Sequence, residues 1–220
     1  MFNIMTLKFI YVAMCFFIAG LSYFRCCNKK DWAWLTAGLL FTVGADYFLV
    51  LHNNHLPGVA VFCFVHVCYI LRGLNGTRRQ QVVLFAVPFL TLSIFIAFVN
   101  GALPVLAGIY AGLFLANIIV NIRFFKGQKN APQALPKLNK GLVLAGLILF
   151  ALCDINVLLF NLPTQLGVDI SFPFAFSLIW VFYLPSQLLL AVSAVSMTKP
   201  IKKLKPPQHP PGQKSISTLP

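Results

Sequence analysis

The stretch FTVGADYFLVLHNNHLPGVAVFCFVHVCYILRG, residues Phe41–Gly73, places an aspartate and a histidine inside two apolar runs. Asp46 belongs to the first run and His66 to the second, and the polar turn HNNH separates the runs. An Asp at the centre of a membrane-spanning helix costs about 2.5–3.5 kcal/mol on insertion scales. The chain has only four acidic residues, all of them Asp, so an Asp in this position indicates a function rather than a solvated surface.

The whole chain of 220 residues repeats this alternation of long apolar runs and short polar connections. Apolar residues make up 59% of it, charged residues only 10%, and the mean hydropathy is +0.84. Seven runs are each about long enough to cross a hydrocarbon core. The pattern therefore predicts an all-α, polytopic membrane helix bundle with spans at residues 6–24, 32–51, 56–73, 82–99, 103–123, 141–160 and 172–196.

The net charge of +13 comes from Lys and Arg residues that fall between these runs instead of on one solvated face. This distribution excludes a nucleic-acid partner, because such proteins gather their cations on one surface. The cations follow the first, third, fifth and seventh spans, and Lys8 alone departs from this alternation. The positive-inside rule then predicts an N-terminus outside the membrane and a C-terminus in the cytoplasm.

We interpret residues 1–196 as one transmembrane helical domain and residues 197–220 as a basic, Pro-rich cytoplasmic tail that is disordered. The first span is expected to remain in the mature protein, because Arg25 and two cysteines follow it in place of a signal-peptidase site. The pair His52 and His55 lies in a predicted solvated turn closed by Pro57. We therefore predict no metal site there.

Several polar residues lie inside the predicted spans, where ionisable groups usually face the bundle interior. His66 and Tyr69 are three positions apart, and Tyr183 and Gln187 are four apart, so each pair shares a helix face. Hydrogen bonds between helices would explain the amides, but they explain an intramembrane Asp less well. The full set of these residues is Asp46, His66, Tyr69, Asn117, Asn121, Asp154, Tyr183 and Gln187.

The two intramembrane aspartates occupy matching depths. Asp46 and Asp154 each lie about fifteen residues into a span that runs outward, roughly 10 Å below its outer end. The span that follows each of them runs inward and contains His66 in the first case and Tyr183 in the second, both about 15 Å below the outer end. This pattern predicts a weak parallel duplication of residues 41–73 and 149–190.

Four segments carry a resemblance to a known family. Its Gly-Asp element resembles GADYFLVL, and its His-x-x-Tyr element resembles PGVAVFCFVHVCYILR. Its later Ser-Asp and Tyr-x-x-x-Gln elements resemble FALCDINVLLF and FYLPSQLLLAVS. The family is the YhhN, or lysoplasmalogenase, family. The resemblance covers about residues 32–196. This chain differs in having Ala45 between Gly44 and Asp46, and Cys153 before Asp154. The family's Lys-Pro helix near the N-terminus and its eighth span are not recognised.

The resemblance implies hydrolysis of the vinyl ether of a lyso-ether phospholipid to a fatty aldehyde and a glycerophospho-headgroup. This reaction needs a proton donor for the β-carbon and an anion that activates water, the division of labour that two carboxylates perform in glycosidases. Asp46 and Asp154 are the expected catalytic pair, with His66 orienting one of them or relaying protons. The residues expected to position substrate or water are Tyr69, Tyr183, Gln187 and Asn117. No metal or cofactor is required.

Other classes of seven-span protein require particular residues in their spans, and the sequence shows whether these are present. A retinal protein needs a Lys in its last span, and residues 172–196 contain none. A zinc amidohydrolase needs several intramembrane His ligands, whereas His66 is the one available. A proton-coupled transporter of small molecules or lipids is the serious alternative, since Asp and His relay protons in such proteins. A purely structural protein comes third. Each reading predicts a multi-pass integral membrane protein whose partner is the lipid bilayer, in the inner membrane if the source is bacterial.

The predicted orientation has a direct consequence for protease sensitivity. In sealed inside-out vesicles the tail from Met197 should be removed by added protease, because its Lys and Pro residues would face the medium. In right-side-out vesicles the same tail should survive. Immunoblotting for a C-terminal epitope measures both results, and a tail cut only in right-side-out vesicles would reverse the orientation.

Overall fold

The computed structural model describes residues 4–26, 28–74, 102–127, 135–166 and 172–195, which are helical almost throughout and contain no strand. The elements are α1 (Ile4–Leu21), the 3₁₀ turn η1 (Ser22–Arg25), α2 (Lys29–Asp46), the π-helical segment η2 (Tyr47–Leu51), α3 (His55–Gly73), α5 (Ala102–Gly127), α6 (Lys137–Leu166) and α7 (Ala175–Val192).

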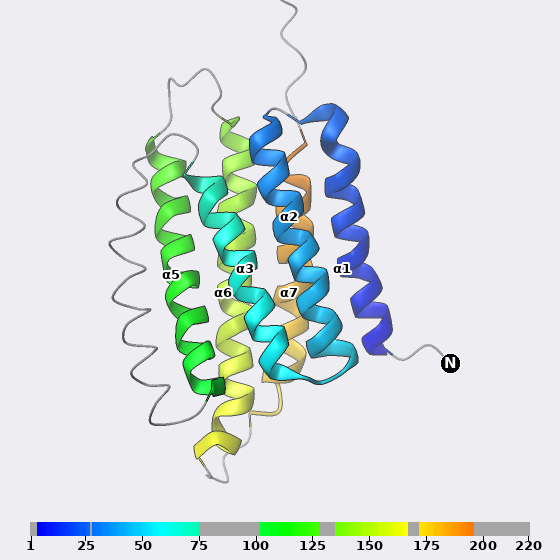
Figure 1. Ribbon diagram of the computed structural model, residues 1–220, viewed down its shortest axis with the longest axis vertical. Coiled ribbons are helices and arrows are strands. Elements are labelled where there is room, and N and C mark those ends of the chain that lie inside the picture. The colour runs from blue at the N-terminus through cyan, green and yellow to red at the C-terminus, as the bar shows by residue number, and fades with distance from the viewer. Residues whose placement is uncertain (1–3, 27, 75–101, 128–134, 167–171, 196–220) are drawn as a thin grey trace, which may run out of the picture.

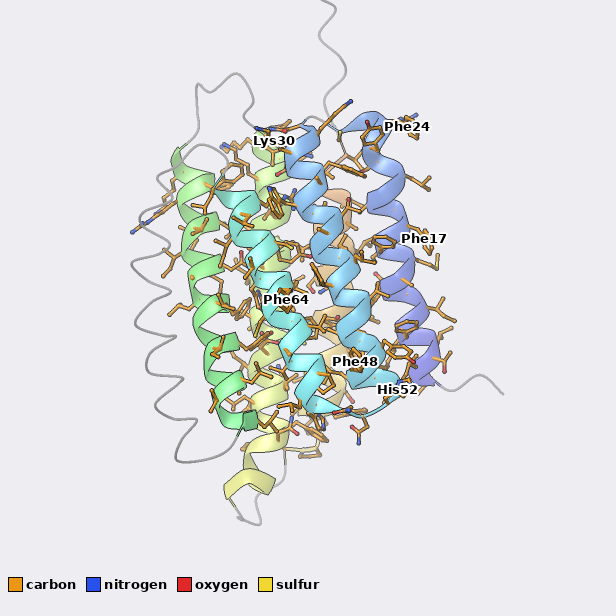
Figure 2. The ribbon with its side chains drawn as sticks, in the orientation of Figure 1. Phe17, Phe24, Lys30, Phe48, His52 and Phe64 are labelled. Atoms are coloured by element: carbon orange, nitrogen blue, oxygen red, sulfur yellow. The ribbon has the colours of Figure 1, made fainter. Side chains whose placement is uncertain are left out.

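Six of these helical units are long and apolar enough to cross a membrane. They coincide with six of the seven predicted spans, and the seventh, at residues 82–99, lies outside the described residues, as does the predicted tail. Exposed apolar side chains point outward from the bundle, among them Phe17 of α1 and Phe24 of η1 (Figure 2). An outer surface of this kind is suited to contact with lipid rather than water.

α1, α3, α5 and α7 run in one direction along the bundle, and α2 and α6 run in the other (Figure 1). The contacts between the elements close five of these helices into a ring. α2 packs on α3, α3 on α5, α5 on α6, α6 on α7, and α7 again on α2. α1 lies outside this ring against α2 and α7. Polar side chains that point into the ring are therefore shielded from lipid on every side described, and this position is where the intramembrane Asp and His residues lie.

The described cations mark one end of the bundle, which we call the basic end. Eight Lys and Arg residues lie there, and Lys30 marks it in Figure 2, whereas His52 marks the opposite end, the His52 end (Figure 2). The eight are Arg25, Lys29, Lys30, Arg72, Arg123, Lys126, Lys137 and Lys140. Lys8, near the start of α1, lies toward the His52 end. Charge patterning thus predicted correctly which helix ends would lie together.

Local chemistry explains how α2 begins and ends. The side chain of Asn28 accepts hydrogen bonds from the backbone N–H groups of Lys30 and Asp31 at 2.9 and 3.4 Å, as an N-cap does. At the other end the helix widens into η2 directly after Asp46. Asn53 then adopts a left-handed φ of 50°, which Asn tolerates better than most residues, and α3 starts at His55.

A buried ion pair ties the helices together at the basic end. Arg72, in the last turn of α3, donates from Nε and Nη2 to the two carboxylate oxygens of Asp31 in the first turn of α2, at 2.9 and 3.0 Å. Both side chains are almost completely buried. Each charge also lies at the helix end whose dipole favours it. Sequence analysis did not identify this pair, because both residues sit among the charges that flank the predicted spans.

The same guanidinium extends the connection to a third helix. Arg72 Nη2 donates to Ser193 Oγ at 3.0 Å, just after α7. Asn139 Nδ2 of α6 in turn donates to the backbone carbonyls of Ser193 and Val195 at 2.9 and 2.6 Å. Four helices are therefore joined through one set of buried polar contacts at this end.

Breaking the ion pair should destabilise the protein strongly. Arg72→Met leaves the Asp31 carboxylate buried without its partner, and we expect a loss of about 3–5 kcal/mol in the free energy of unfolding. The double variant Asp31→Asn/Arg72→Met should lose clearly less than the two single changes added together. Unfolding of the purified protein in mixed detergent micelles measures all three, with the exposed neighbour Lys30→Gln as a neutral control. Strict additivity of the single changes would contradict the coupling.

Candidate functional site

Asp46 is held by a hydrogen bond across the ring of helices. It is the last residue of α2 before η2, and its side chain is 3% exposed. Tyr183 Oη of α7 donates to Asp46 Oδ2 at 2.7 Å. In the predicted duplication Tyr183 belongs to the same half as Asp154, on the span that follows it. The geometry instead joins the first half's Asp to the second half's Tyr.

Asp154 has an equivalent partner from a different helix. Tyr110 Oη of α5 donates to Asp154 Oδ2 of α6 at 2.6 Å. Asp154 is only partly buried, whereas Asp46 is fully buried. The two carboxylates therefore make the same kind of hydrogen bond, although one is fully buried and the other only partly buried.

An aromatic cluster connects the two Tyr–Asp pairs. The Phe150 ring lies 5.8 Å from that of Tyr183 and 5.9 Å from that of Phe62, and the Phe62 ring lies 6.2 Å from that of Tyr110. Cys153, directly before Asp154, is buried as well. Both pairs thus flank one buried region of the bundle. That the two carboxylates act together on one substrate stays a prediction.

His66 is completely buried beside this cluster and bonds an amide rather than a carboxylate. Its ring lies 4.8 Å from the Tyr110 ring, and Asn117 Nδ2 lies 3.3 Å from His66 Nδ1. Asn121 Nδ2 donates to the backbone carbonyl of Asn117 and, at 2.7 Å, to Asn117 Oδ1. These contacts leave Asn117 Nδ2 as the donor to His66 Nδ1. His66 therefore carries its proton on Nε2, which has no partner among the described residues.

Two further predicted residues lie on the same helices without contacting either carboxylate. Tyr69 packs so closely on α2 that a Cβ on Gly38 would come within 2.6 Å of its ring. Gln187, one turn after Tyr183, is fully buried and donates from Nε2 to Ser186 Oγ at 3.3 Å. Its Oε1 has no partner in the part of the chain that the structure describes.

The arrangement is suited to proton transfer rather than to metal binding. No cluster of three or more His, Cys, Asp or Glu side chains occurs within the described ranges. His52 lies in the exposed turn, where its Nδ1 is 3.0 Å from the carbonyl oxygen of Tyr47. Two carboxylates, each supplied with a hydroxyl proton donor, instead resemble the acid and base groups of a hydrolytic site.

Tyr110 is the residue of this site that the sequence analysis missed. A Tyr in an apolar helix normally reads as part of the core, because its ring buries a large apolar area. A signal was nevertheless present: Tyr110 lies seven positions before Asn117 and eleven before Asn121, so the three share one face of α5. That face is the one that meets His66 and Asp154.

A sequence model of the YhhN family matches residues 5–194, which is most of the chain. The chain therefore belongs to the YhhN family, and the resemblance identified from its motifs is confirmed. Neither a curated protein nor a solved structure matches it significantly.

Removing each tyrosine hydroxyl in turn should destabilise the protein to a different extent, because the two carboxylates differ in burial. Tyr183→Phe leaves Asp46 without its hydrogen bond and without water, and should cost about 1–2 kcal/mol in the free energy of unfolding. Tyr110→Phe should cost less, because Asp154 is partly exposed. The exposed Tyr47→Phe is the matched control and should change nothing. Unfolding in micelles checks the order, and a larger loss from Tyr110→Phe would contradict it.

Proposed function

We propose that this member of the YhhN family is a lysoplasmalogenase-like hydrolase, which cleaves the vinyl ether of a lyso-ether phospholipid. The observation that carries the proposal is the pair of intramembrane carboxylates, each hydrogen-bonded by a tyrosine at 2.6–2.7 Å in surroundings of different exposure. Family membership is compatible with this activity. The lipid substrate explains why such groups lie at membrane depth, since it would reach them laterally from the bilayer.

In the first step Asp46 acts as the acid. It transfers a proton to the β-carbon of the vinyl ether, and the electron pair of the double bond forms the new C–H bond. The product is an oxocarbenium ion paired with the Asp46 carboxylate, whose new charge the Tyr183 hydroxyl stabilises. We assign this role to Asp46 because it is the more deeply buried of the two, away from bulk water.

In the second step Asp154 acts as the base. We assign this role to Asp154 because it is the less buried of the two, and it takes a proton as the water oxygen adds to the cation. The hemiacetal then collapses: its hydroxyl proton returns to Asp46, and the proton on Asp154 goes to the departing glycerol oxygen. The products are a fatty aldehyde and a glycerophospho-headgroup, and both carboxyl groups regain their starting states.

His66 and Asn117 act on this chemistry through Tyr110, which His66 contacts directly. The His66 ring packs against Tyr110 and so fixes the hydroxyl that bonds Asp154. Asn117 holds the His66 ring through Nδ1 and directs Nε2–H toward a water or a substrate oxygen. We assign Tyr69 and Gln187 to the walls of the substrate site, where Gln187 Oε1 would accept a hydrogen bond from a substrate hydroxyl or water.

The proposal predicts a specific isotopic product. Purified protein in micelles, given a 1-alkenyl lysophospholipid in D₂O, should release aldehyde with one deuterium at the carbon next to the carbonyl, because that carbon receives the enzyme's proton. Mass spectrometry of the trapped aldehyde measures it. Unlabelled aldehyde incubated with the protein in D₂O controls for exchange. The 1-acyl and 1-alkyl analogues, which lack the vinyl ether, should not be cleaved.

The carboxylates should be essential in this assay. Asp46→Asn and Asp154→Asn should each lower kcat by about 10²–10⁴-fold, the contribution of a positioned acid or base. Tyr47→Phe should leave kcat unchanged. Activity that survives both Asn changes would refute the mechanism. The alternative, a proton-coupled transporter, is favoured if the protein produces no aldehyde but moves protons with a solute in proteoliposomes, with loss of transport in the same two variants.

A further inference from the structure

Lys8 is a cation at the end of the bundle where the described part of the chain places no other Lys or Arg. Eight of the nine described Lys and Arg residues lie at the basic end, whereas Lys8 lies one turn into α1 at the His52 end (Figure 1). A cation inside an apolar span is costly, and such residues usually serve a substrate or an ion. The position of Lys8 is therefore a candidate for binding.

Aromatic rings of α7 hold the ammonium group of Lys8. Lys8 Nζ lies 3.9 Å from the ring centre of Trp180 and 5.3 Å from that of Phe176. Ring faces attract a cation without neutralising its charge. Among the described acids, Asp31 pairs with Arg72, while Asp46 and Asp154 accept from tyrosines. The fourth, Asp169, lies outside the described residues.

This ammonium lies close to the Tyr183–Asp46 pair. The Trp180 ring is 6.0 Å from the Tyr183 ring, and Tyr183 donates to Asp46. Together with the 3.9 Å between Lys8 Nζ and Trp180, this limits the distance from Nζ to the Tyr183 ring to about 10 Å. Trp180 thus lies between the Lys8 ammonium and the tyrosine that holds the candidate acid.

This upper limit is compatible with the dimensions of a glycerophospholipid. Its phosphorus lies five bonds from the ether oxygen at the first glycerol carbon, roughly 6 Å at ordinary bond lengths. A phosphate on Lys8 Nζ therefore leaves the ether within reach of Tyr183 and Asp46. The buried Arg72 cannot serve instead, because its partner Asp31 lies fifteen positions before Asp46 on α2, about 22 Å away along the helix.

We propose that Lys8 binds the phosphate group of the substrate lysophospholipid, with Trp180 and Phe176 holding its ammonium near the Tyr183–Asp46 pair. This inference rests on the proposed hydrolase function and adds the feature that selects a phosphorylated substrate. Lys is suited to the role, since a phosphate accepts hydrogen bonds from its three N–H donors.

Two substrates that differ only in the phosphate test the proposal. Lys8→Gln should raise KM at least tenfold for a 1-alkenyl lysophospholipid but leave kcat/KM unchanged for the corresponding 1-alkenylglycerol. Lys8→Arg should recover most of the loss, and Lys30→Gln, the exposed control at the basic end, should have no effect. An equal loss on both substrates would overturn the proposal, because it would show that Lys8 supports the fold or the chemistry instead.

A binding measurement separates this inference from the hydrolase proposal. A 1-alkyl lysophospholipid carries the phosphate but no vinyl ether, so its binding in micelles does not depend on cleavage. Lys8→Gln should weaken it at least tenfold relative to wild type, without changing the binding of 1-alkylglycerol. Millimolar inorganic phosphate should not compete, since the lipid supplies the anchoring. Unchanged binding in Lys8→Gln, or displacement by free phosphate, would overturn the lipid-phosphate assignment even if hydrolysis is confirmed.

Discussion

The hydrogen bond from Tyr183 to Asp46 is the contact on which the organisation of this bundle depends. In a hydrocarbon environment no water is available to a carboxyl group, so each polar group must find a partner on another helix or on its own backbone. Asp46 finds one on α7, and this contact lies where α2 and α7 close the ring of helices. The need to pair this one acid therefore favours the packing of α2 against α7. The hydrogen bond from Tyr183 offsets the cost of burying the carboxyl group.

The same rule organises the protein at two levels. At the basic end, the Arg72–Asp31 pair joins α2 to α3 and reaches α7 through Ser193. Deeper in the bundle, the two Tyr–Asp pairs join α2 to α7 and α5 to α6. The first set involves a complete ion pair and so has a structural role. The second set gives each carboxyl group a neutral hydroxyl partner in place of a cation.

Apolar periodicity and charge placement were sufficient to predict the helical class, six helices as described, and the shared end of the Lys and Arg residues. They were also sufficient to single out Asp46, Asp154 and His66, because a polar residue in an apolar run is visible without a structure. They did not reveal which of these side chains would form hydrogen bonds with one another. The hydrogen bond between Tyr183 and Asp46 was not predicted, since a sequence gives the order of helices along the chain but not which of them are adjacent across a ring. Tyr110 was missed because an aromatic residue in an apolar helix normally belongs to the core. Arg72 was missed because a cation at the end of a span normally marks the topology.

The π-helical segment Tyr47–Leu51 has a mechanical consequence for the site. Residues before and after it follow different rotational phases, because its hydrogen bonds span one residue more than those of an α-helix. Asp46 lies on the regular side of this transition and Leu51 on the other. The side chains of the surface turn therefore face in directions that an uninterrupted α-helix would not give them, whereas the direction of Asp46 is set by the regular part of α2.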